Sequence, residues 1–214
     1  MSQEPMPSSS DQPVSPVFVV YDFACPYSYI AQHEVDRLHD EFEISPPRWR
    51  PYWLHPDLPE AGRTFADTMS AEKRATVTGW LSEMSPELGA DLEFPDLQMY
   101  SLHAFAAMEF ARDRGLDVEL RRAAFRAVWV ESRNIGDLAV IDDLLVEVGL
   151  DPEPFRDGYD SFRSRALAAS KKVQQLGLTT TPTVLLGKKA IVGWHYYEVL
   201  ERVLDDQNVP ARAS

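Results

Sequence analysis

The sequence predicts an α/β fold in which a β-α-β segment and a β-β-α segment are separated by a large all-helical insertion. Three observations support this. A β-branched and aromatic run begins at Val17, a Gly-Lys turn joins two apolar runs between residues 181 and 194, and the residues between them are mostly of helical periodicity. We therefore expect one sheet-containing domain, residues 17–56 and 177–206, interrupted by a helical insertion, residues 57–176.

The first half of the sheet domain is expected to be a strand, a helix and an edge strand. Residues 17–21 (VFVVY) are typical of a buried strand. After Cys25 and Pro26, apolar or small residues recur at helical spacing: Ala31, Val35, Leu38 and Phe42. The segment EISPPRWRPYWL (residues 43–54) is expected to be an extended edge strand, because its prolines remove hydrogen-bond donors from the ladder.

The insertion is expected to be a series of amphipathic helices. Its apolar stripes are Leu102, Phe105, Ala106 and Phe110; Val118, Phe125, Val128 and Trp129; and Leu138, Ile141, Leu145 and Val148. Asp137 is a predicted N-cap, and Gly177 is predicted to end the last helix of the insertion. The chain then continues as the hairpin TPTVLLGKKAIVGW and a helix from His195 to Leu204.

Composition and charge argue against some classes of partner and location. The chain has 214 residues with 34 acidic and 21 basic side chains, a net charge of −13, so we expect neither nucleic acid nor an anionic membrane as a partner. Residues 1–16 carry no basic residue and no apolar stretch, which predicts a disordered leader rather than a secretory signal. A single cysteine cannot form an intrachain disulfide, so we expect a cytoplasmic protein.

That cysteine, Cys25, stands between the first strand and the first helix. If the helix begins at Pro26, Cys25 is its N-cap and the sulfur faces the free N–H groups of Tyr27 and Ser28. Those bonds favour a thiolate, so we expect a lowered pKa. The helix dipole supplies only about 0.3–1 kcal/mol, less than the ~1.4 kcal/mol of one pKa unit. Direct hydrogen bonds, including one from the Ser28 hydroxyl, must therefore account for most of the lowering of the Cys25 pKa. The alternative is a buried, unreactive cysteine.

Four segments in the right order resemble a known group: DFACPYSYI, RWRPYWLHPDLPEAG, FRAVWVESRNIGDLAVIDDLLVEVGLDP and LGLTTTPTVLLGKKAIVGW. They are similar to the DsbA-like thioredoxin-fold family, in particular the FrnE-like dithiol-disulfide isomerases. Kappa-class glutathione transferases and 2-hydroxychromene-2-carboxylate isomerases are its cousins. The resemblance implies a thioredoxin-like fold with a helical insertion, Cys25 as the active thiol, and a cis peptide bond between Thr181 and Pro182.

The resemblance also indicates where substrate would bind, and where this chain departs from its relatives. We expect substrate contacts from Pro26, Tyr27, Thr181, Pro182, Trp194, His195 and His55. FrnE-like members have a second cysteine where this chain has Ser28, and the glutathione-binding branch has serine in place of Cys25. Trp194-His195 replaces a small-plus-acidic pair of that branch.

We therefore expect a DsbA-like thiol-disulfide oxidoreductase or isomerase that acts through one cysteine, with Cys25 as nucleophile and Ser28 steadying its thiolate. A serine cannot resolve a mixed disulfide, so an external thiol must do so. The substrate would be a thiol or disulfide, on a peptide or a small molecule. No tightly bound cofactor and no metal site are expected, since His33, His39 and His103 are scattered. Glutathione is a candidate co-substrate, and a homodimer a candidate assembly.

Two alternatives stay open at this point. One is a glutathione-dependent transferase, or an isomerase like those acting on 2-hydroxychromene-2-carboxylate. The other is a non-catalytic, chaperone-like module that binds peptides.

Overall fold

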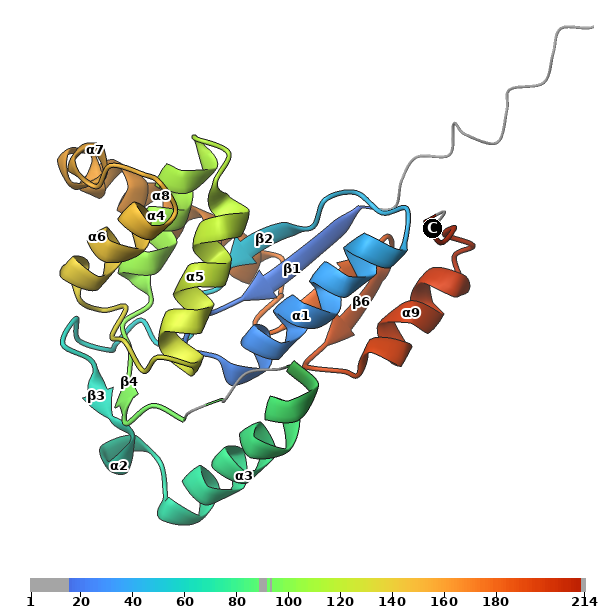
Figure 1. Ribbon diagram of the computed structural model, residues 1–214, viewed down its shortest axis with the longest axis horizontal. Helices are drawn as coiled ribbons and strands as arrows, with labels where there is room; N and C mark the ends of the chain where they lie inside the picture. Colours follow the sequence, from blue (N-terminus) through green and yellow to red (C-terminus); the bar gives the residue numbers. More distant parts are fainter. Residues whose placement is uncertain (1–15, 89–91, 93, 213–214) are drawn as a thin grey trace, which may run out of the picture.

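A four-stranded mixed sheet lies at the centre of the protein (Figure 1). The computed structural model describes residues 16–88, 92 and 94–212, so the expected leader, apart from Pro16, lies outside the described residues. The strand order is β2-β1-β5-β6, with β1 and β2 parallel and the other pairs antiparallel. The strands are β1 (Val17–Tyr21), β2 (Arg48–Pro51), β5 (Thr183–Leu186) and β6 (Lys189–Val192).

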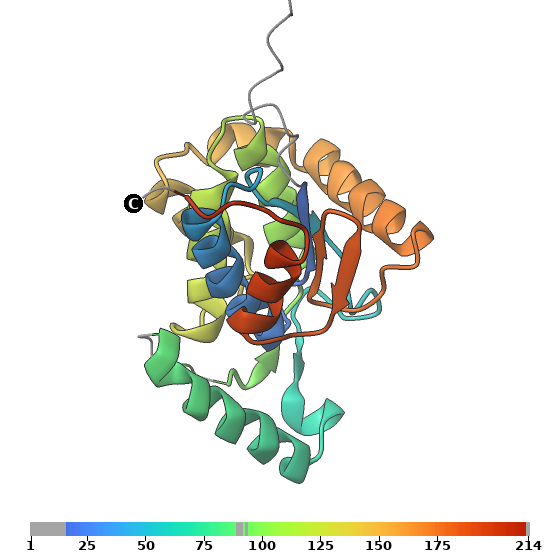
Figure 2. The same ribbon diagram turned by 90° about the vertical axis from the view of Figure 1, so that its right-hand side faces the viewer.

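Helices cover both faces of this sheet. Figure 2 shows α1 (Pro26–Glu41) and α9 (Tyr197–Asp205) on one side and α8 (Tyr159–Gln175) on the other. The thioredoxin-like fold is thereby confirmed, as are the hairpin with its Gly187-Lys188 turn and the edge position of β2. Two expected boundaries are wrong: β2 is shorter than residues 43–54, and α9 begins at Tyr197 rather than at His195.

The insertion is mostly helical but contains a small antiparallel ribbon, so the expectation of an all-helical insertion is wrong in this detail. Arg63 pairs with Gln98 and Thr64 with Leu97, which joins β3 (Arg63–Thr64) to β4 (Leu97–Gln98). The remaining helices are α2 (Phe65–Thr68), α3 (Ala71–Leu88), α4 (Leu102–Arg112), α5 (Asp117–Trp129), α6 (Leu138–Glu147) and α7 (Glu153–Asp157). Asp137 caps α6 by accepting a bond from the Ala139 N–H, as predicted.

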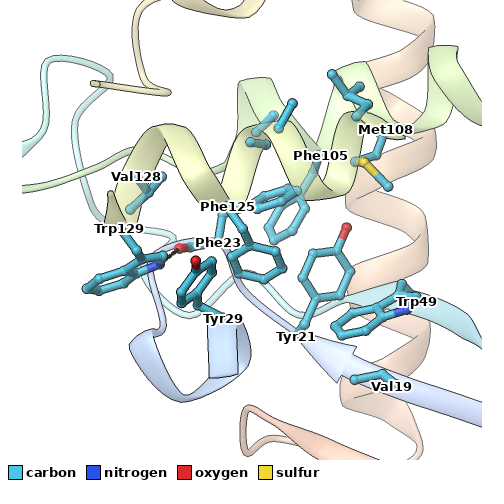
Figure 3. Close-up of a cluster of buried hydrophobic side chains, with 14 of the residues drawn as sticks. Val19, Tyr21, Phe23, Tyr29, Trp49, Phe105, Met108, Phe125, Val128 and Trp129 are labelled. Atoms are coloured by element: carbon cyan, nitrogen blue, oxygen red, sulfur yellow. Dashed lines mark hydrogen bonds between the residues drawn. The ribbon is translucent and has the colours of Figure 1, made fainter. Parts of the chain in front are cut away.

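One aromatic core joins the sheet to the insertion (Figure 3). The Tyr21 ring lies edge-on to Phe23 and to Phe105, with ring centroids 5.1 and 5.5 Å apart, and Phe23 lies 4.8 Å from Phe125. Such tilted and edge-to-face pairs are favourable arrangements for buried rings. The insertion therefore packs against the end of β1, the strand that precedes the turn to Cys25. The division of the chain into a sheet domain, residues 17–56 and 177–206, and an insertion, residues 57–176, stays a prediction.

Among the described residues, no helix is both long enough and apolar enough to cross a membrane.

Candidate active site

Cys25 is the N-cap residue of α1, as the sequence predicts. A turn closed by the Cys25 N–H and the Asp22 carbonyl, 3.1 Å apart, connects β1 to the helix, and Pro26 occupies the first helical turn. Proline is well suited there because its missing N–H would have had no helical partner. The Ser28 N–H donates to the Cys25 carbonyl at 3.0 Å.

The Cys25 sulfur is covered, as in the alternative of a buried cysteine and not as in the expectation of an open one. The residue is only 6% exposed, and the thiol donates to the Thr181 carbonyl with an Sγ–O distance of 3.5 Å. The side chain makes no capping bond to the first turn of α1. The expectation of an open sulfur is therefore wrong for this structure, although the Ser28 hydroxyl and the Ser28 N–H still interact with the thiol.

The expected lowering of the Cys25 pKa is also wrong. Burial raises the pKa of this thiol, and interactions with Thr181 and Ser28 oppose that effect without overcoming it. Desolvation sets the direction, because burial penalises the charged thiolate more than the neutral thiol. A raised pKa favours the neutral thiol over the thiolate in the folded protein.

We expect the alkylation rate of native Cys25 to keep rising with pH beyond about 8.5, the pKa of a free thiol. A raised folded-state pKa also favours folding below the ordinary thiol pKa, an advantage lost as the pH rises through that value toward the folded one. The measurement is the rate of iodoacetamide labelling between about pH 7 and 10.5, with the urea-unfolded chain as control. A native midpoint below that of the unfolded chain would contradict the assignment.

The loop that faces the sulfur contains the cis peptide bond between Thr181 and Pro182, so that prediction is confirmed. The Pro182 carbonyl accepts from the Gly193 N–H at 2.8 Å, which ties the end of β6 to this loop. Thr181 is 9% exposed, and its hydroxyl has no hydrogen-bond partner of ordinary geometry among the described residues. The sulfur, the Thr181 carbonyl and the residues after β6 thus meet at one place.

Ser28 lies behind the sulfur and is fully buried. Its hydroxyl oxygen lies 3.4 Å from the N–H of Asp22, a long hydrogen bond. Asp22 itself accepts bonds from the N–H of Ala24, the N–H of Leu54 and the hydroxyl of Ser101, at 2.9, 2.8 and 2.5 Å. Burial raises the pKa of this carboxyl group, and those three donors oppose the rise.

Asp22 is a positioning residue that the sequence reasoning missed. It connects the turn before Cys25 to the loop after β2 and to the start of α4. An acidic residue immediately after an apolar strand, in the run VVYDF, was the available signal. Buried carboxyl groups need partners, and a local sequence pattern does not identify them.

A row of aromatic rings runs from the first turn of α1 through α3 to the residues after β6. Tyr27 contacts Trp80 of α3 at a centroid distance of 4.5 Å, Trp80 contacts Trp194 at 5.4 Å, and Trp194 contacts Tyr196 at 4.5 Å. Tyr27 and Trp194 were expected at the site; Trp80 was not. α3 carries no strong apolar stripe, so nothing in its local sequence marks this contact.

The other expected substrate residues lie at the margin. Pro26 is half-buried in the first turn of α1. His55 is exposed in the loop after β2. The His195 Nε2 lies 3.2 Å from the Val192 carbonyl, so this ring turns back on its own strand. The structure gives neither histidine a hydrogen bond to Cys25.

No group of three or more histidine, cysteine or acidic side chains is arranged to bind a metal ion within the described part of the chain.

Known proteins resemble this chain along most of its length. Bacillus subtilis (strain 168) YwbO, named an uncharacterized protein, is 24% identical over 196 residues, which cover 88% of this chain and 95% of that protein. A probable DsbA oxidoreductase from Streptomyces coelicolor has a TM-score of 0.80 at 19% identity, covering 94% of this chain and 93% of that one.

Two further similar structures belong to proteins named for other activities. A 2-hydroxychromene-2-carboxylate isomerase has a TM-score of 0.68 at 17% identity, with 90% and 94% of the two chains covered. The cytosolic disulfide reductase DsbM from Pseudomonas aeruginosa, solved with glutathione, has a TM-score of 0.61 at 19% identity, with 90% and 98% covered. At these identities the likeness shows a shared fold. The model of the DSBA-like thioredoxin domain matches residues 17–205, and the chain therefore belongs to that family.

Proposed function

We propose that this protein is a thiol-disulfide oxidoreductase or isomerase in which Cys25 alone forms the mixed disulfide with substrate. The observation that carries this proposal is the position of the Cys25 sulfur, at the start of α1 and 3.5 Å from the Thr181 carbonyl of the cis-proline loop. A substrate backbone lying along that loop would bring its own sulfur close to Cys25. The setting we propose is the cytoplasm, and Pro26 and Tyr27 would line the approach.

The reaction has two exchange steps. The Cys25 thiol first loses its proton to solvent, and the thiolate attacks a substrate disulfide. An S–S bond forms to Cys25, the substrate S–S bond breaks, and the other substrate sulfur leaves as a thiolate. An external thiol such as glutathione then attacks the mixed disulfide, takes the substrate sulfur into a new disulfide and releases Cys25. The Ser28 hydroxyl cannot perform this second step, because it does not ionise near neutral pH.

The test is turnover of a glutathionylated peptide with reduced glutathione. We expect Cys25→Ser to fall to the uncatalysed rate, because serine cannot form the mixed disulfide. Val146→Ala, at a position 61% exposed on α6, is the matched control and should keep the full rate. If Cys25→Ser turns over as fast as the unaltered protein, the proposal fails.

A second candidate is a binding protein without thiol chemistry, and the burial of Cys25 at 6% exposure favours it. In that case native Cys25 would resist both alkylation and oxidised glutathione at every pH at which the protein stays folded. Glutathione-dependent isomerase or transferase chemistry is a third candidate, because the 2-hydroxychromene-2-carboxylate isomerase shares the fold. It would show glutathione binding that survives Cys25→Ser.

A further inference from the structure

We propose that Trp80 closes the approach to Cys25 and forms, with Tyr27 and Trp194, a recognition site for an aromatic or bulky apolar group bonded to the substrate sulfur. This inference rests on the proposed function, since it takes Cys25 as the reacting group. It adds a residue from the insertion and a substrate class.

The first step is the placement of Trp80 across the site. Tyr27 lies two residues after Cys25, on one side of the sulfur. Trp194 follows Gly193, whose N–H binds the Pro182 carbonyl, so it lies on the side of the cis-proline loop. Trp80 contacts both rings, at 4.5 and 5.4 Å. Its indole therefore joins the first turn of α1, which Cys25 caps, to the residue that follows Gly193.

α3, the helix that carries Trp80, is buried through few of its side chains. Figures 1 and 2 both show this helix alongside the end of the sheet domain where α1 begins. Leu81 and Met84 are its buried side chains among those described, whereas most of its first ten residues are exposed. Gly79, beside Trp80, has nothing within 4 Å of an added Cβ, so this turn of α3 is open on the Gly79 side. The Trp80 ring itself is a partly buried side chain packed against the hydrophobic core.

Tyr27, Trp80 and Trp194 offer apolar ring faces, and buried donors lie near them. Tyr27 is 38% exposed, and Trp80 is half-buried, so aromatic faces are available to a ligand. The Trp194 Nε1–H is buried and has no hydrogen-bond partner among the described residues, and the same holds for the Thr181 hydroxyl. Buried donors without partners are uncommon and costly. A ligand with an apolar ring and a nearby acceptor, such as a peptide carbonyl, would satisfy both the rings and these donors.

The test uses two thiosulfonates, methyl and benzyl methanethiosulfonate, on the full chain. The Cys25 thiolate attacks the sulfenyl sulfur, an S–S bond forms, the S–SO₂ bond breaks and methanesulfinate leaves, while the thiol proton passes to solvent. Rates are divided by those of the same reagents with N-acetylcysteine, which removes their intrinsic reactivity. We expect the unaltered protein to prefer the benzyl reagent by about tenfold, the size of effect that one apolar contact commonly produces.

Trp80→Ala should abolish that preference and speed labelling by the methyl reagent, because the cover is gone. Trp80→Phe should keep the preference, and Gly79→Ala, its neighbour on α3, should leave it unchanged. Trp80→Gln supplies a second test if the alanine variant does not fold. An unchanged preference in Trp80→Ala or Trp80→Gln overturns the inference, as does equal reaction of both reagents with the unaltered protein.

These readings are separate from the proposed function. A protein that prefers the benzyl reagent through Trp80 but does not turn over a glutathionylated peptide would retain the recognition site and lose the proposed activity. Turnover of the glutathionylated peptide without a Trp80-dependent preference would support the proposed activity and overturn the recognition site.

Discussion

Ser28→Cys is expected to convert the protein from one that stops at a mixed disulfide into one that forms its own disulfide. Cys25 and Ser28 are the N-cap and third residue of α1, one helical turn apart. That spacing brings two Cα atoms to about 5–6 Å, within the range that a disulfide spans. A thiolate held there attacks the mixed disulfide intramolecularly, where effective concentrations far exceed those of a free thiol.

The measurement is the intact mass after treatment with oxidised glutathione. The unaltered protein should retain one glutathionyl group, whereas Ser28→Cys should release it and lose two hydrogen atoms as the disulfide closes. Ser28→Ala is the control: it removes the hydroxyl without adding sulfur, so its mixed disulfide should persist. Because Ser28 is fully buried, the larger sulfur is expected to cost about 1 kcal/mol of folding stability. A glutathionyl group that persists in Ser28→Cys would contradict the geometry.

Features set by local chemistry could be read from the sequence. The strand before Cys25, the helix opened by Pro26 and the hairpin at Gly187 each depend on residues within a few positions of one another. The cis bond before Pro182 came from the family resemblance, because few such bonds are cis in proteins generally. Helix ends are less certain, and α9 begins two residues later than expected, at Tyr197. The strands of the β3–β4 ribbon are too short to show a period.

The burial of the Cys25 sulfur and the direction of its pKa shift could not be predicted from the local sequence. The N-cap position of Cys25 depends on its neighbours, but its burial depends on Thr181, which is distant in sequence. Desolvation then outweighs the local hydrogen bonds that the sequence argument relied on, and the direction of the pKa change is reversed. The same applies to Asp22, whose partners Leu54 and Ser101 lie on separate segments.

The largest loss of stability is expected at Trp129. This residue is 1% exposed, and its Nε1–H donates to the Phe23 carbonyl at 2.9 Å, a bond drawn in Figure 3. Trp129→Ala removes a large buried ring and is expected to lower the free energy of unfolding by about 3–5 kcal/mol. That is a large share of the ~5–15 kcal/mol that holds a typical domain folded. The measurement is the midpoint of urea unfolding at an unchanged m-value.

Trp129→Phe separates the hydrogen bond from the rest of the ring. It keeps an aromatic side chain but leaves the carbonyl of fully buried Phe23 without its donor, which is expected to cost about 1–3 kcal/mol. Phe23 lies two residues before Cys25, so loosening it should also raise the iodoacetamide labelling rate of the native thiol more than the lost stability alone would. Val146→Ala should change neither quantity. If Trp129→Phe is as stable as the unaltered protein and labels at the same rate, the bond to Phe23 does not position the cysteine turn, and the packing of Phe23 against Phe125 must hold it instead.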